Sequence, residues 1–384
     1  MRKEPIIFQK YPCDYLHTLW NNGLFDEYSD DHFLIKALNG RLDSFNWSEQ
    51  FINNNLSIYP VINKDRTINY DLFCSNFCIN LSFKLKFLSN VFGADKIEKF
   101  IVDQLSAGKD RYDENVFFQA LSEIEILSFF HRGFGWDSTD YEPSETKHGK
   151  NPEARFTGTI DGKHYEINIE VKTAEFPIVD VKRERKVIPI ILENDKCAAV
   201  SNYCSKNRIR LIKPRVTKLV DFLNSACDKF SLFDDEIVNL LYINWSYSDF
   251  PSNSFLEPWS LMTNEINGIL CKERICDKLH FRETLNPDFK RKISAIIVYT
   301  SSIEELMFSD FRHVWQRGSA GCKFRMWLID ETKRNEIIKL TGMNPDMAAT
   351  HVCMIDYPCS CVEEEAEREI VLRDLQTIIV NNAL

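Results

Sequence analysis

The apolar positions change from a helical to an alternating period between residues 119 and 172, and this change marks the most informative part of the chain. Over residues 119–131 the apolar residues recur at helical spacing, which predicts an amphipathic helix packed on a sheet. The residues of this apolar stripe are Leu121, Ile124, Leu127 and Phe130. Glu123 and Glu125 lie beside the stripe, so either both are solvated acids or one of them faces the segment that follows.

Alternating polar and apolar residues follow this helix and predict a β-hairpin. Residues 153–160 are expected to form its first strand, Asp161 and Gly162 its two-residue turn, and Lys172 the end of its second strand. Side chains alternate between the two faces of a strand, so Glu170 and Lys172 share a polar face. Glu166 and Asn168 belong to the same face, and the opposite, apolar face carries Tyr165, Ile167, Ile169 and Val171.

The segments around the hairpin complete an α/β core. Residues 133–150 are rich in Gly, Ser, Thr, Asp and Pro and predict a surface loop before the hairpin. After the hairpin we expect a helix over residues 216–230 and two buried apolar strands over residues 237–245 and 293–299. Helix, hairpin, helix and two strands together predict a central sheet flanked by helices.

Three regions follow from this organisation. Residues 1–110 form a mostly helical N-terminal region of unassigned role, residues 111–330 the α/β core, and residues 331–384 a helical C-terminal extension. The core contains an insertion near residues 249–287. In the extension we expect one helix after Asp330 and a longer helix over about residues 362–379.

Composition places the chain among globular proteins. It has 384 residues, of which 44% are hydrophobic and 12% aromatic, enough to build a sizeable core. We find no apolar run of membrane-spanning length and no charged-then-apolar leader, so we expect no membrane association and a cytoplasmic location. The 12 cysteines are scattered along the chain and are expected to be free thiols, with Cys74 and Cys78 packed inside a helical region.

The charge distribution is uneven along the chain. The net charge of −10 argues against a protein that coats nucleic acid. Residues 182–218, however, contain 11 basic residues against 3 acidic ones and directly follow the predicted hairpin. The candidate phosphate contacts in this basic segment are Lys182, Arg183, Arg185, Lys186, Arg208, Arg210 and Lys213.

The order of acidic residues resembles the PD-(D/E)XK nuclease superfamily, which includes many restriction endonucleases. The residues that carry the resemblance are Glu123 or Glu125 on the helix, Pro152-Glu153 opening one strand and Glu170-Val171-Lys172 closing the next. The resemblance covers about residues 115–300. It implies a restriction-endonuclease-like core, in which a central mixed sheet is flanked by helices.

The resemblance also implies a chemistry. Glu153 and Glu170 would ligate Mg²⁺, or alternatively Mn²⁺; Lys172 would be the catalytic lysine, and Glu123 or Glu125 a supporting acid. Two carboxylates and a substrate phosphate suffice to hold Mg²⁺, which lowers the pKa of bound water and neutralises developing charge. A neighbouring lysine stabilises the charged transition state. We therefore expect a metal-dependent endonuclease that hydrolyses DNA, in restriction or antiviral defence.

Several alternatives stay open. The family usually has Asp where this chain has Glu153, which allows an inactive nuclease fold that only binds nucleic acid. Asp180-Val181-Lys182 is a rival for the second half of the motif, but Pro177 disfavours a central strand there. RNA is an alternative substrate to DNA. A regulatory or oligomerisation subunit, with a protein partner or a second copy of the chain, is a further alternative.

Overall fold

We describe the structure from a computed structural model of the chain. It describes residues 14–44, 68–105, 113–132, 134–143, 150–174, 186–189, 194–211, 216–245, 256–263, 269–270, 285–299, 324–345, 354–357, 373–375 and 377–378.

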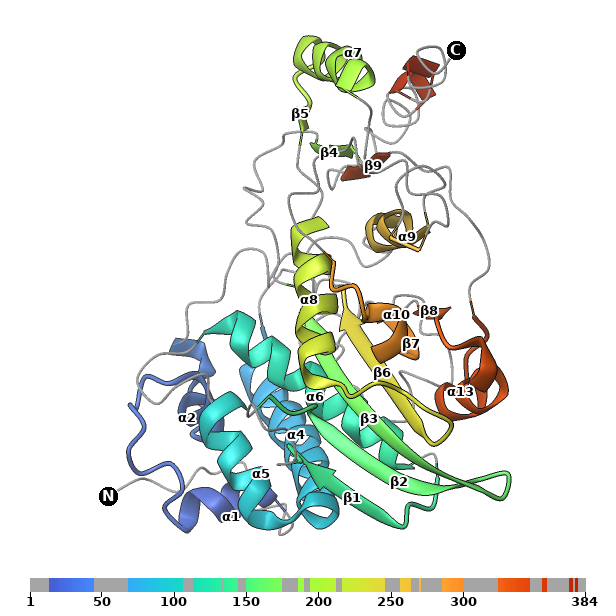
Figure 1. The fold of residues 1–384 in the computed structure, drawn as a ribbon. Coiled ribbons are helices and arrows are strands. Elements are labelled where there is room, and N and C mark those ends of the chain that lie inside the picture. The colour runs from blue at the N-terminus through green and yellow to red at the C-terminus, as the bar shows by residue number, and fades with distance from the viewer. Residues whose placement is uncertain are drawn as a thin grey trace.

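A mixed sheet of six strands lies at the centre of the described residues (Figure 1). In the order in which they pair, the strands are β1 (Ser138–Tyr141), β2 (Ala154–Ile160), β3 (Lys163–Thr173), β6 (Ile237–Asn244), β7 (Ala295–Tyr299) and β8 (Phe324–Leu328). Strand β1 pairs antiparallel with β2 and β2 antiparallel with β3, β6 and β7 continue parallel to β3, and β8 pairs antiparallel with β7 at the edge of the sheet.

Two helices define how the chain enters and crosses this sheet. Helix α6 (Glu114–Arg132) precedes β1, and helix α8 (Val216–Lys229) connects β3 to its parallel neighbour β6. Along the chain, α6 is followed by the three antiparallel strands β1, β2 and β3, and α8 comes directly before the parallel strand β6; elements of a second sheet lie between β3 and α8. The predicted α/β class is confirmed, as are the helix before the hairpin, the hairpin, the helix over 216–230 and the two apolar strands.

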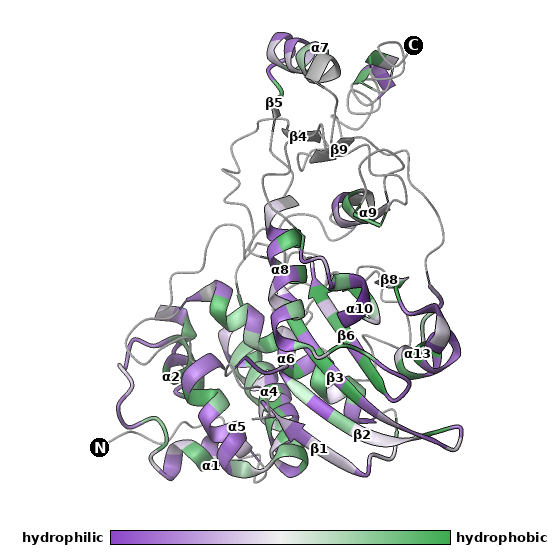
Figure 2. Ribbon diagram, in the orientation of Figure 1, coloured by the Kyte–Doolittle hydropathy of each residue, from purple (hydrophilic) through white to green (hydrophobic). Residues whose placement is uncertain are grey.

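The two faces of the sheet are covered by different helices (Figures 1 and 2). On one face, the apolar side chains of β3 pack with α6 and the N-terminal helices. On the other face, α8 packs on Leu241, Ile243, Ile296 and Val298 of β6 and β7. The predicted alternation of β3 is confirmed, because Tyr165, Ile167, Ile169 and Val171 all lie in the first core. The polar face of β3 consequently points toward the side of α8.

The N-terminal helices belong to the same hydrophobic core as α6. They are α1 (Tyr15–Asn21), α2 (Phe33–Leu38), the 3₁₀ turn η2 (Leu42–Ser44), α4 (Tyr70–Phe92), α5 (Ala94–Phe100) and the π-helical turn η3 (Ile101–Leu105). The long helix α4 packs against α6 and carries Cys74 and Cys78, which are free and buried, as predicted. Buried residues of these helices, of α6 and of β2 and β3 form one continuous cluster.

One prediction near the hairpin is wrong. The segment predicted as a surface loop, residues 133–150, contains the edge strand β1. Its sequence, Ser-Thr-Asp-Tyr, has no apolar alternation and buries only Tyr141, so hydrophobic periodicity gives no signal for it. The hairpin turn is confirmed: Asp161 and Gly162 have φ angles of +53° and +82°, the left-handed conformation that a tight two-residue hairpin turn requires.

The remaining elements lie in the basic segment, the predicted insertion and the C-terminal extension. Strands β4 (Lys186–Pro189), β5 (Arg210–Leu211) and β9 (Met354–Tyr357) form a second, three-stranded sheet in the order β5-β4-β9, beside helix α7 (Asn194–Lys206). The other elements are α9 (Leu256–Thr263), α10 (Phe289–Lys292), η5 (Glu331–Lys333) and α13 (Arg334–Thr341).

The C-terminal extension is described only in part. Helix α13 confirms the helix predicted after Asp330. Most of the helix predicted over about residues 362–379 lies outside the described residues, and the five described positions there are helical. None of the described helices combines the length and the apolar character needed to cross a membrane.

Candidate active site

Three residues selected from the sequence meet where β2 begins and β3 ends. The register pairs Ala154 with Ile169, so Glu153, immediately before β2, lies beside Glu170 on β3. Lys172, two residues further along β3, points to the same face as Glu170. Its Nζ atom lies 2.5 Å from Glu170 Oε1 and 3.8 Å from Glu153 Oε1. The short spacing along one strand and the hairpin register thus bring the two carboxylates and the ammonium group together.

A second lysine reaches the same carboxylates from α8. Lys229 is the last residue of this helix, and its Nζ atom lies 2.8 Å from Glu170 Oε1 and 3.0 Å from Glu153 Oε1. Sequence reasoning missed Lys229, which lies 57 positions beyond Lys172 and carries no motif of its own. Only the packing of α8 on the polar face of β3 brings it to the site.

Helix α6 contributes Glu123 and not Glu125. Tyr141 of β1 donates a hydrogen bond from its Oη to Glu123 Oε1 at 2.8 Å, and the charges of Glu153 and Glu170 act on Glu123. Glu125 instead forms a buried ion pair with Lys84 of α4, with 2.7 Å between Lys84 Nζ and Glu125 Oε2. The alternative in which both acids are solvated is therefore wrong, and Glu123 is the one that faces the hairpin.

A fourth acid borders the site through the backbone. The amide of Glu142, directly after β1, donates to the carbonyl oxygen of Glu153 at 2.9 Å. Glu142 has a φ of +46°, a left-handed conformation that is uncommon for residues other than glycine. The charge of Glu142 also acts on Glu123. The ends of β1, β2 and β3 therefore carry a row of acids: Glu142, Glu153 and Glu170.

Burial and like charge perturb the acids of this row. Burial, followed by the charge of Glu153, raises the pKa of Glu170 to about 7, although Lys172 and Lys229 oppose the rise. Burial and then the charge of Glu153 hold the pKa of Glu123 well above its ordinary value. Burial would lower the pKa of Lys229, but the charges of Glu153 and Glu170 outweigh it and raise that pKa. Perturbed titrating groups that converge in this way are common in active sites and also occur in structural ion-pair networks.

The carboxylates of the site are candidate ligands for a divalent metal. Glu170 is fully buried and its Oε2 has no hydrogen-bond partner among the described residues, so a buried carboxylate oxygen is left for a further ligand. Within the described residues, no group of three or more His, Cys, Asp or Glu side chains is arranged around one point. Mg²⁺ commonly takes only one or two protein carboxylates and completes its shell with water and substrate phosphate. Glu153 and Glu170 fit that pattern.

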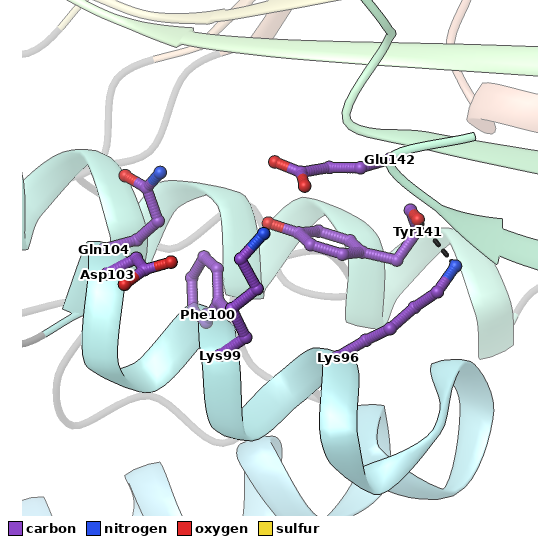
Figure 3. A pocket seen from close by; sticks show the side chains of 7 residues that line it. All are labelled: Lys96, Lys99, Phe100, Asp103, Gln104, Tyr141 and Glu142. Atoms are coloured by element: carbon purple, nitrogen blue, oxygen red, sulfur yellow. Dashed lines mark hydrogen bonds between the residues drawn. The ribbon is translucent and has the colours of Figure 1, made fainter. Parts of the chain in front are cut away.

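A surface cavity adjoins the row of acids on the side of the N-terminal helices (Figure 3). Its volume is about 270 Å³, and it is lined by Lys96, Lys99, Phe100, Asp103, Gln104, Tyr141 and Glu142. Lys96 is fixed by an ion pair with Asp140 and by donating to the carbonyl oxygen of Tyr141 at 2.8 Å. Tyr141 separates the cavity from Glu123, so the cavity and the candidate site share a wall.

The predicted phosphate contacts are described only in part. Four of them lie outside the described residues: Lys182, Arg183, Arg185 and Lys213. The rival motif, Asp180-Val181-Lys182, also lies there. Lys186 and Arg210 are paired neighbours on β4 and β5, whereas Arg208 is exposed before β5 with a φ of +55°. Lys186, Arg208 and Arg210 therefore lie in or next to the three-stranded sheet.

Comparisons with protein-family models, with curated proteins and with solved structures gave no significant match. The assignment of the site therefore rests on its own geometry and chemistry.

Proposed function

We propose that this chain is a metal-dependent endonuclease that hydrolyses phosphodiester bonds of DNA. The observation that carries the proposal is the meeting of Glu153, Glu170 and Lys172 at the adjoining ends of β2 and β3. The same three residues carry the resemblance to the PD-(D/E)XK motif in the sequence. Unrelated surface residues would have no reason to converge on one buried carboxylate.

The order of the elements supports the same proposal. The resemblance implies a helix with an acid, strands that carry the acid and acid-x-Lys residues, then a helix and a further strand. The chain has α6 with Glu123, then β1, β2 and β3, and, after the inserted elements β4, α7 and β5, it has α8 and the parallel strand β6. Glu123 lies on the helix, Glu170 and Lys172 lie on β3, and Glu153 lies directly before β2. Fold alone does not establish function, so the weight of the proposal stays on the site.

Each residue has a distinct role in this proposal. Glu153 and Glu170 would hold the divalent ion, which supplies an activated water and neutralises charge on the phosphate. Lys172 places an ammonium group beside Glu170, where it stabilises negative charge developing on the phosphate oxygens. Glu123 contributes a further negative charge, and the hydroxyl of Tyr141 fixes its orientation. Glu153 reaches the site although it stands where the family usually has Asp, because it precedes the strand and its longer side chain spans the distance.

The substrate class follows from charge. The chain has a net charge of −10, but its basic segment carries 11 basic residues against 3 acidic ones. Such a segment binds phosphates without regard to base sequence. This charge supports a nucleic-acid substrate whose backbone contacts the basic segment, and we propose DNA rather than RNA as that substrate.

One observation favours a second candidate, a nuclease-like protein that binds nucleic acid without cleaving it. Lys172 and Lys229 together neutralise Glu153 and Glu170. Buried ion-pair networks of this kind also occur as purely structural features. In such a protein, Glu153 and Glu170 would stay paired with the two lysines, and the basic segment would be the surface that binds nucleic acid.

The two candidates are separated by a cleavage assay on plasmid and linear DNA in Mg²⁺, in Mn²⁺ and in EDTA. Cleavage by the wild-type protein that needs metal and disappears in Glu170→Gln supports the endonuclease. Glu331→Gln is the matched control, because Glu331 and Lys333 repeat the Glu-x-Lys spacing away from the sheet, and Glu331 is ion-paired with Arg334 at the surface. This variant should cleave like the wild type. DNA binding without cleavage under any condition supports the second candidate.

A further inference from the structure

The two carboxylates assigned to the metal already share a cation. Lys229 Nζ lies within 3.0 Å of one oxygen of each, Glu153 Oε1 and Glu170 Oε1. It therefore bridges the two acids, as a bound divalent ion would. A metal that uses these two oxygen atoms must replace the ammonium group of Lys229.

The fold holds Lys229 at this position. It is the C-terminal residue of α8, where the helix dipole favours a positive charge. The same turn is fixed by an ion pair from Lys150 to Asp228 at 2.6 Å and by Lys292, which donates to the carbonyl oxygen of Cys227 at 2.7 Å. The side chain of Lys229 is 20% exposed, unlike that of Glu170, which is fully buried. The ammonium group of Lys229 therefore has a route to solvent, whereas the carboxylate of Glu170 has none.

We propose that Lys229 is an exchangeable counter-cation that competes with the divalent metal for Glu153 and Glu170. This inference rests on the proposed function and adds to it a control of metal loading. In the metal-free protein, Lys229 acts together with Lys172 to compensate the buried charge of Glu170, which would be costly if left unpaired, and Lys229 is the closer of the two lysines to Glu153. Metal binding displaces the ammonium group, so the apparent metal affinity is lowered by the stability of the displaced ion pairs.

Displacement also couples the metal to the substrate. An ammonium group released from the acids at the surface of the site becomes available to a DNA phosphate, which stabilises the displaced position. DNA then favours metal binding, and by reciprocity the metal favours DNA binding. Lys229 thus keeps the occupancy of the metal site low until DNA binds.

The inference is tested by titrating the metal-free protein with Mn²⁺ in a calorimeter, without DNA and without any measurement of activity. We compare the wild type with Lys229→Met, which keeps the length of the side chain and removes its charge. The matched control is Lys150→Met, which removes a charge from the same end of α8 without touching the two carboxylates. Lys229→Met should bind Mn²⁺ at least about tenfold more tightly than the wild type, because it no longer repels the ion at close range. Lys150→Met should stay within about twofold.

The outcomes distinguish this inference from the proposed function. Equal Mn²⁺ affinity in the wild type and Lys229→Met would overturn the competition and leave the metal site standing. Absence of Mn²⁺ binding in all three proteins would overturn both. Binding that appears only in Lys229→Met would support the competition in its strongest form.

A second measurement uses the wild type alone, so it holds even if Lys229→Met fails to fold. Lysines are acetylated briefly with an amine-reactive reagent in Mn²⁺ or in EDTA, and modification is read for each residue by mass spectrometry. The reactivity of Lys229 should rise several-fold in Mn²⁺, because its ion pairs are broken, while that of Lys150 should not change. An unchanged reactivity of Lys229 in protein that binds Mn²⁺ would overturn the inference.

Discussion

Glu123 and Glu125 lie on one turn of α6, but their side chains have very different surroundings. Glu125 forms an ion pair with Lys84 of α4, and both side chains are almost completely buried, at 1% and 3% exposure. Glu123 faces a group in which Glu153 and Glu170 share two lysines at the edge of the solvent. The first pair joins two helices of the core. The second group joins several acids to two lysines that are 19% and 20% exposed, so solvent reaches it.

The comparison shows how to tell a structural ion pair from a functional cluster. A buried ion pair is balanced in charge, so removing either member destabilises the fold. In the cluster, burial and then the charge of Glu153 raise the pKa values of Glu170 and Glu123, and a further cation would offset both effects. Substitutions in the pair should therefore affect stability, whereas substitutions in the cluster should affect chemistry.

The largest expected effect is on stability and comes from Lys84→Met. This change leaves the buried Glu125 without its partner and should lower the free energy of unfolding by about 3–5 kcal/mol. Urea denaturation followed by circular dichroism measures it. DNA cleavage per folded molecule should stay within about twofold of the wild type. A loss of stability below about 1 kcal/mol would contradict a structural role for the pair.

The next effect is on catalysis and comes from Lys172→Met. Removing the ammonium group beside Glu170 should lower the rate of DNA cleavage about 10²–10³-fold, because a charge that stabilises the transition state is lost. Single-turnover cleavage assays measure the rate, and filter binding should show DNA affinity within about twofold. Loss of DNA binding equal to the loss of cleavage would place Lys172 in the binding surface instead.

Glu123→Gln should have a smaller effect. The side chain keeps its shape and its hydrogen bond with Tyr141 but loses its negative charge, so cleavage should fall about 10–100-fold. Glu125→Gln is the informative comparison, because it lies two residues away and should lower stability while sparing the chemistry. If Glu125→Gln reduced cleavage per folded molecule more than Glu123→Gln did, the assignment of the two acids would be reversed.

Tyr141→Phe should have the smallest effect of the four. It removes one hydrogen bond to Glu123 and should lower cleavage by less than about tenfold and stability by about 1 kcal/mol. Steady-state cleavage and thermal unfolding measure the two quantities. Cleavage identical to that of the wild type would mean that the orientation of Glu123 does not depend on this bond.

Much of this arrangement is predictable from the sequence, because it depends on periodicity. Alternating residues up to Lys172, the Asp161-Gly162 turn and the apolar stripe of the preceding helix predict the hairpin and place Glu170 and Lys172 on one face. Side chains two residues apart on a helix point about 200° apart, so Glu123 and Glu125 must diverge. Which of them faces the site depends on Lys84 and Tyr141, which belong to elements distant in sequence.

Two features could not be predicted because tertiary packing determines them. Strand β1 is a short, polar edge strand whose pairing with β2 defines it, and its composition is that of a loop. Lys229 ends a helix that the sequence predicts, but no pattern shows that this helix end would lie over Glu153 and Glu170. Local patterns give the elements and their faces, whereas contacts between distant elements decide which charges meet.

The most direct test of the account is a crystal structure of the protein soaked in Mn²⁺, with the anomalous scattering of the metal recorded. We predict an anomalous peak within coordination distance of the carboxylates of Glu153 and Glu170, with the ammonium group of Lys229 moved away from both. A peak that is absent at saturating Mn²⁺, or that lies elsewhere while Lys229 still bridges the two acids, would contradict the account.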